Sequence, residues 1–170
     1  MGLLRPLPAP LRLSDPSVLI ATWFGVGLLP KAPGTWGSAA ALIIGAAIAW
    51  AAGPYAGPVL LAAAALAFGT GIIASNRYVK AAGRDDPSEV VIDEVAALWL
   101  VLAALPLEFV AYLIGFVLFR LFDIFKPWPV SLADRRLKGG LGIMADDVLA
   151  ALYALGCLAV LAWLSGGLLL

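Results

Sequence analysis

The chain has 170 residues, of which 63% are apolar or aromatic and only 13% are charged. Soluble domains carry roughly 25% charged residues, so this composition argues against an autonomous soluble domain and excludes disorder. The 11 Lys and Arg balance the 11 Asp and Glu, which leaves no net positive charge to favour nucleic acid as a partner. The sequence has no histidine and a single cysteine, which excludes imidazole catalysis and an internal disulfide.

The first apolar run, residues 18–29, is too short to cross a membrane. Twelve helical residues rise about 18 Å, against a hydrocarbon core of roughly 30 Å. We therefore expect an interfacial or re-entrant segment. Two longer runs follow, residues 38–52 and 58–74, joined by the uncharged turn-forming residues 53–57. This pattern predicts a helical hairpin.

A second hairpin is predicted within residues 95–119, where residues 106–108 separate two apolar runs of 11 residues. These runs either extend into their polar flanks or lie buried in the bundle without crossing. The last run, residues 148–170, carries no charge and is the clearest transmembrane candidate. The fold class predicted is all-α: a helical integral membrane protein in one domain, residues 1–170. It would be a compact bundle of about five membrane-embedded helices behind the N-terminal segment.

The charges predict how this bundle is oriented in a membrane. If the N-terminus is cytoplasmic and the five later helices cross, all 11 Lys and Arg lie on the cytoplasmic side. Glu108 is then the one carboxylate on the opposite side. This distribution agrees with the positive-inside rule. We expect a multi-pass protein whose two polar stretches, residues 75–94 and 120–147, face the cytoplasm.

The first polar cluster ends in Asp93 and Glu94, next to an apolar run. Asp86 and Pro87 are typical of a helix start, which would place Glu89 and Asp93 on one helix face. Ionised groups beside a lipid-length apolar run are costly and are usually functional. The alternative is a solvated helix start stabilised by the helix dipole.

The second cluster spaces Arg120, Asp123 and Lys126 three residues apart, and Pro127 is expected to end their helix. The cations could bind phosphate while Asp123 holds a metal, or they could form ordinary ion pairs. In the third cluster, three glycines between residues 139 and 142 precede Asp146 and Asp147. This carboxylate pair could bind a metal or simply cap the last helix.

Further cations and hydroxyls accompany these clusters. Lys31 and Thr35 lie in a glycine-containing turn that lacks P-loop spacing but could touch a phosphate, and Arg135 could contact an anionic headgroup. Hard carboxylate oxygens suit Mg²⁺. Together with cations on the cytoplasmic side of a membrane, they favour phosphoryl chemistry on a lipid headgroup, with water activated by the metal.

The motifs resemble those of the phosphatidylglycerophosphatase A family. Four blocks occur in family order across most of the chain, and together they are far more specific than any one alone. They are A-P-G-T-W-G-S at residues 32–38, D-P at 86–87 with V-V-I-D-E-V at 90–95, F-R-L-F-D-I-F-K-P-W-P at 119–129, and D-R at 134–135 with G-G-L-G-I-M-A-D-D-V-L-A at 139–150. One departure is Ala96-Ala97, where the family usually has a glycine.

The resemblance implies an all-helical, Mg²⁺-dependent phosphatase of the bacterial cytoplasmic membrane. It would hydrolyse the terminal phosphate of the phospholipid phosphatidylglycerophosphate to give phosphatidylglycerol and inorganic phosphate. The positions carried over are Thr35, Asp86, Asp93, Glu94, Arg120, Asp123, Lys126, Asp134, Arg135, Asp146 and Asp147.

Combining motifs and resemblance, we predict two sets of site residues. The catalytic and metal-binding set is Asp93, Glu94, Asp123, Asp146 and Asp147. The substrate-binding set is Lys31, Thr35, Arg120, Lys126 and Arg135. Within this scheme a carboxylate that holds no metal serves as the base for the attacking water. A phospho-aspartate intermediate is the second mechanism considered, although the D-x-D-x-[TV] pattern is absent.

Other functions remain as alternatives. The protein could be a phosphatase of another phospholipid, or a small cation transporter with a carboxylate-lined site. A CDP-alcohol phosphatidyltransferase also uses clustered aspartates, but its D-G-x-x-A-R motif is missing from this chain. A non-catalytic membrane scaffold does not explain three carboxylate clusters. The sequence does not specify an oligomeric state.

Overall fold

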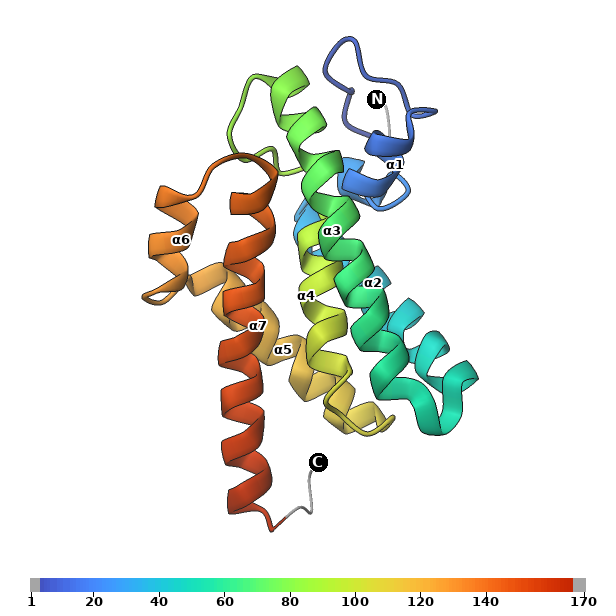
Figure 1. Cartoon of the computed structure of the whole chain (residues 1–170), viewed down its shortest axis with the longest axis vertical. Coiled ribbons are helices and arrows are strands. Elements are labelled where there is room, and N and C mark those ends of the chain that lie inside the picture. The colour runs from blue at the N-terminus through green and yellow to red at the C-terminus, as the bar shows by residue number, and fades with distance from the viewer. Residues whose placement is uncertain (1–3, 167–170) are drawn as a thin grey trace.

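The computed structural model describes residues 4–166, which are 74% helical and contain no strands. The predicted all-α fold class is confirmed (Figure 1). The predicted run 148–170 corresponds to the last long helix, and its residues 167–170 lie outside the described part of the chain. The elements are α1 (Pro16–Ala21), η1 (Val26–Leu28), α2 (Pro33–Ala52), η2 (Gly53–Tyr55), α3 (Ala56–Ala82), α4 (Ile92–Leu102), α5 (Phe109–Phe125), α6 (Val130–Arg136) and α7 (Gly139–Leu164).

Helix α4 forms the centre of the bundle. It contacts α2, α3, α5 and α7, and most of its side chains are buried. Its 11 residues rise only about 16 Å, so it lies inside the bundle instead of extending into its polar flank. The buried Trp99 indole N–H donates to the Ala41 carbonyl at 2.9 Å, which fixes α4 against α2. Ala96 and Ala97 are both buried, so their methyl groups are part of this packing.

The N-terminal segment forms two short helical pieces at one end of the bundle (Figure 1). The chain reverses between α1 and η1 through residues 23–25, all with positive φ. This agrees with the expectation that the segment does not span. The Ala21 carbonyl accepts the Val91 N–H at 2.8 Å, and the Arg5 guanidinium donates to the Ser88 hydroxyl at 2.7 Å. The segment therefore holds the loop that leads into α4.

That loop corrects one expectation about α4. The sequence predicted a helix starting near Pro87, but α4 begins at Ile92, after Val91, whose backbone is not helical. Glu89 is buried and accepts from Arg84 at 2.8 Å, so it does not share a helix face with Asp93. The tertiary contact of Val91 with α1 prevents the helical turn that local signals favoured.

The connections rich in charged residues lie at one end of the bundle, and those at the other end carry Glu108 as their one charged residue. The α3–α4 loop and α6 lie toward the end that holds the N-terminal segment, whereas η2 and the α4–α5 turn lie at the other (Figure 1). Two helical stretches, residues 33–82 and α7, are long and apolar enough to cross a membrane. The architecture is therefore that of a helical membrane protein with one polar end.

The packing of α2 on α4 generates a stability prediction. A Cβ on Gly45 would lie 2.8 Å from Leu102 Cδ1 and 3.0 Å from Trp99 Cδ1, and Trp99 is held by its hydrogen bond. We expect Gly45→Ala to lower the free energy of unfolding by about 1–3 kcal/mol, measured by thermal unfolding in detergent.

The matched control for this change is Gly69→Ala in α3. An added Cβ at Gly69 meets no atom within 4 Å, so the gain in helix propensity should stabilise by up to about 1 kcal/mol. Equal midpoints for the two variants would contradict the close α2–α4 contact.

Candidate active site

A polar cavity of about 320 Å³ opens at the charged end of the bundle. Its volume lies within the usual range for small-molecule sites, about 300–1,000 Å³. Eight carboxylates and three cations line it, an excess of five negative charges if all are ionised. Such a cluster is stable only with protons or metal cations between the carboxylates. The charged lining residues are Asp85, Asp86, Asp93, Glu94, Asp123, Asp134, Asp146, Asp147, Arg120, Lys126 and Lys138.

Three of these carboxylates form a candidate metal centre. Asp93 and Glu94 lie in the first turn of α4, and Asp147 lies in α7. One oxygen from each lies within 4.8 Å of the other two. Asp93 Oδ1, Glu94 Oε2 and Asp147 Oδ2 are buried and have no hydrogen-bond partner among the described residues. Unpartnered buried oxygens of this kind fit a hard divalent cation such as Mg²⁺.

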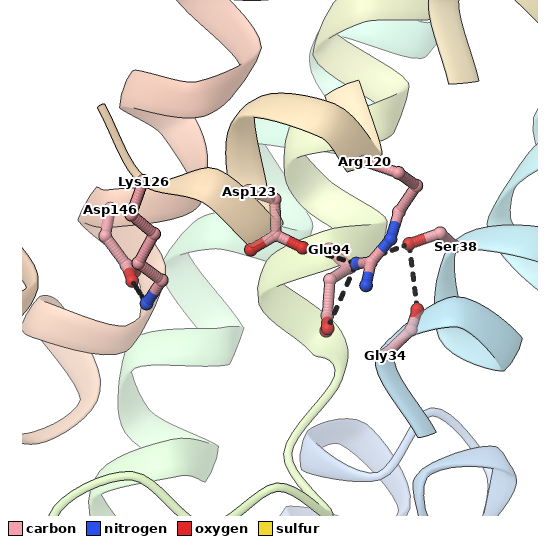
Figure 2. A network of polar contacts seen from close by, with 7 residues as sticks. All are labelled: Gly34, Ser38, Glu94, Arg120, Asp123, Lys126 and Asp146. Carbon is pink, nitrogen blue, oxygen red and sulfur yellow. Dashed lines mark hydrogen bonds and ion pairs between the residues drawn. The ribbon is translucent and has the colours of Figure 1, made fainter. Parts of the chain in front are cut away.

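Arg120 lies between Glu94 of α4 and Ser38 of α2 (Figure 2). Its Nη1 lies 2.5 Å from Asp123 Oδ2 and 3.6 Å from Glu94 Oε1. The same nitrogen donates to the Ser38 hydroxyl at 3.3 Å, and Ser38 donates in turn to the Gly34 carbonyl at 2.9 Å. Arg120 is therefore fixed by α2, α4 and its own helix, and it neutralises part of the charge.

Gly34 allows the start of α2 to approach this centre. A Cβ at this position would overlap the Glu94 carboxylate and lie 3.4 Å from Arg120 Nη1. Ser38 lies in the second turn of α2, because that helix begins at Pro33. Its hydroxyl holds Arg120 in place.

Lys126 forms a second cationic position, next to α6 and α7. It follows the last residue of α5, before Pro127 as expected, and donates to Asp134 at 2.5 Å and to Asp146 at 2.7 Å. Burial alone would lower the pKa of its ammonium group, but these hydrogen bonds outweigh burial and raise the pKa above its usual value. Lys126 is therefore positively charged throughout the physiological pH range.

The structure brings together most of the predicted site residues. All five predicted catalytic carboxylates, with Arg120 and Lys126, line the cavity. Lys31, Thr35 and Arg135 are exposed and are not among its lining residues as far as the chain is described. Their role in substrate binding stays a prediction. The contribution of Gly34 was missed, although it lies within the A-P-G-T motif.

One further contact was not anticipated from the sequence. Lys138 donates to Asp85 at 3.0 Å across the cavity rim, joining the α3–α4 loop to the residue before α7. No spacing rule relates two positions so far apart, so sequence patterns contain no signal for this pair.

Fold and site together define a helical membrane protein with a carboxylate-rich candidate metal centre flanked by two fixed cations. The chain matches the family described as Phosphatidylglycerophosphatase A over residues 19–162. It belongs to this family, which confirms the resemblance seen in its motifs and the prediction that it is an enzyme, a phosphatase.

The relatives cover most of the chain. A phosphatidylglycerophosphatase A of Haemophilus influenzae is 41% identical over 145 residues, covering 85% of this chain and 87% of the relative. A phosphatidylglycerophosphatase A of Escherichia coli is 36% identical over 151 residues, covering 87% of this chain and 84% of the relative. A protein of Bacteroides thetaiotaomicron with the provisional name phosphatidylinositol-3-phosphatase is 41% identical over 154 residues, covering 88% of this chain and 95% of the relative. No solved structure gives a significant match.

The candidate metal centre predicts a stability response to Mg²⁺. A ligand bound only by the folded state stabilises it by about 2.7 kcal/mol at one hundred times its dissociation constant. We expect Mg²⁺ to raise the thermal midpoint of the wild type and to have little effect on Asp147→Asn. Without Mg²⁺, this variant should be at least as stable as the wild type, because one of several mutually repelling charges is removed.

The control for this experiment is Glu108→Gln. Glu108 is an exposed carboxylate at the N-cap of α5, at the opposite end of the bundle. Its variant should retain the full Mg²⁺ response. An undiminished response in Asp147→Asn would remove this residue from the metal centre.

Proposed function

We propose that this enzyme hydrolyses the terminal phosphate monoester of phosphatidylglycerophosphate with Mg²⁺ held by Asp93, Glu94 and Asp147. The observation that carries the proposal is the convergence, in one cavity, of a carboxylate triad with Arg120 and Lys126. Carboxylates suit a divalent cation, and fixed cations suit a phosphate. The family assignment supports the lipid substrate.

The two cations bind and orient the phosphate. Lys126 has three N–H donors, and its contacts with Asp134 and Asp146 leave one for a phosphate oxygen. Arg120 lines the same cavity and is held there by Glu94 and Asp123, so its guanidinium adds a second fixed positive charge. Because neighbouring helices hold both side chains in place, they stabilise the charge that develops on the phosphoryl oxygens with little rearrangement.

Asp146 is the carboxylate best placed to take the proton of the attacking water. Lys126 orients its Oδ2, and its buried Oδ1 is unpartnered within residues 4–166. When bound, Mg²⁺ supplies positive charge for the phosphoryl oxygens and makes a bound water more acidic. Asp123 is engaged by Arg120 and serves to position that side chain. Attack by water requires no covalent enzyme intermediate.

The orientation in the membrane belongs to the same proposal. The polar end, with the cavity and the cationic segments, faces the cytoplasm, and the helices form a multi-pass bundle in the bacterial inner membrane. The positive-inside rule supports this orientation, as does the placement of Glu108 at the other end. A substrate phosphate would enter from the lipid headgroup region.

A phosphoinositide phosphate is the second candidate for the lipid substrate. The observation that favours it is the Bacteroides thetaiotaomicron relative, whose provisional name is phosphatidylinositol-3-phosphatase. The same cations and metal centre would suit either phosphate monoester, so the two candidates differ in the alcohol that carries the phosphate. The choice requires a direct comparison of the two lipids.

Phosphate release tests the proposal and separates these substrates. The purified protein in detergent should release phosphate from phosphatidylglycerophosphate with Mg²⁺ and should lose this activity in EDTA. We expect a kcat/KM at least tenfold lower for phosphatidylinositol 3-phosphate. The reverse preference would favour the second substrate, and release unaffected by EDTA would contradict the metal.

Replacing the Lys126 ammonium tests its role in binding the phosphate. Loss of one fixed donor to a developing charge typically costs about 10²–10³ in rate, so we expect Lys126→Met to lower kcat/KM by this factor at neutral pH. Lys80→Met is the control, since Lys80 is exposed on α3 outside the cavity. Equal activity of the two variants would remove Lys126 from the proposed site.

A further inference from the structure

An apolar groove of about 670 Å³ runs between α5 and α7, separate from the polar cavity. It is open along one side, so it faces the lipid when the helices are in a membrane. The residues that line it are Leu118, Leu149, Leu152, Tyr153, Gly156, Cys157, Val160 and Leu161. Tyr153 supplies its one hydroxyl, and charged side chains are absent from this lining.

The groove continues the face of α7 that carries the active-site carboxylate. Asp146 is followed on this face by Leu149, Tyr153, Gly156 and Val160, at spacings that keep residues on one side of a helix. With a rise of 1.5 Å per residue, the groove begins about 5 Å and ends about 21 Å along the axis from Asp146. The α7 wall of the groove therefore leads away from the polar site.

Helix α5 contributes one residue, Leu118, to a lining that α7 otherwise forms. Phe122, four residues on from Leu118, lies on the same face of α5. Lys126 follows the last residue of this helix. Phe122 packs against the Tyr153 ring with centroids 5.2 Å apart, and Lys126 contacts Asp146. Lys126 and Asp146 thus meet at the polar ends of α5 and α7, and the apolar groove lies farther along both helices.

Tyr153 and Trp128 mark the level at which the groove meets the membrane surface. The Tyr153 hydroxyl donates to the Trp128 carbonyl at 2.6 Å, and the Trp128 side chain is 74% exposed. Exposed tryptophans concentrate at the boundary between headgroups and hydrocarbon. The groove thus extends from this boundary to the depth at which acyl chains lie.

We infer that the groove holds one acyl chain of the lipid whose phosphate occupies the polar cavity. This assignment rests on the proposed function, since only a lipid substrate joins an anionic phosphate to an apolar chain in one molecule. Lipid chains are as apolar as the groove, so moving a chain into it adds little attraction. The groove instead orients the substrate so that its phosphate reaches Lys126.

Gly156 provides a way to block the groove without disturbing the helix. An added Cβ at this position meets no atom within 4 Å, and the residue lies ten positions, or about 15 Å, along α7 from Asp146. A Gly156→Phe side chain would occupy groove space. Gly69→Phe is the matched control, because its Cβ also meets no atom within 4 Å and it lines neither the groove nor the polar cavity.

The experiment compares two forms of phosphatidylglycerophosphate in detergent with Mg²⁺. One form carries dioleoyl chains. The other carries dibutanoyl chains, which are too short to reach Gly156. We expect Gly156→Phe to lower kcat/KM at least tenfold for the long-chain lipid and less than twofold for the short-chain lipid. Gly69→Phe should match the wild type on both, with unchanged thermal midpoints confirming that each variant is folded.

Two results would overturn the assignment. Wild-type rates of Gly156→Phe on the long-chain lipid would show that the groove is an ordinary contact with bilayer lipid. An equal loss on both lipids would show that the substitution acts on the site and not on a chain. If the wild type released no phosphate from either lipid, the proposed function would fail, and the acyl-chain assignment with it.

Discussion

The placement of Asp93 and Glu94 at the start of a central, buried helix is the constraint on which the rest of the site depends. Helix α4 is surrounded by α2, α3, α5 and α7, so these carboxylates have little access to water. Ionised groups in such surroundings require cations. Arg120 supplies one, and its position depends on Asp123 beside it and on Ser38 across from it.

Two of the cavity's three cations, Arg120 and Lys126, contact different carboxylates. Arg120 contacts Glu94 and Asp123 on one side, while Lys126 contacts Asp146 on the other (Figure 2). The buried oxygens of the triad that face no cation mark the place where a divalent ion fits best. Charge balance and the candidate metal centre are thus two consequences of the same packing.

An enzyme acting on a phospholipid must accommodate a charged and an apolar part of one molecule. This bundle likewise changes from charged to apolar along its length. Its charge-rich segments and the polar cavity lie at one end. The turns at the other end (Figure 1) have Glu108 as their one charged residue. Helices α5 and α7 contribute to both regions, because each carries site residues at its polar end and groove residues farther along. The position of a bound lipid would therefore depend on the register between these two helices.

The sequence alone determined the helical class, the positions of the apolar segments, the collection of most charges at one end and the carboxylates that line the cavity, because apolar runs and motif spacing are local properties of the chain. The tertiary structure decided where α4 begins, since the contact of Val91 with Ala21 overrides the helix-start signals at Asp86 and Pro87. It also decided which cation meets which carboxylate, as with Lys126 and Asp146, which are 20 residues apart. Such pairings depend on how helices pack, and that packing is set by complementary shapes along whole helices.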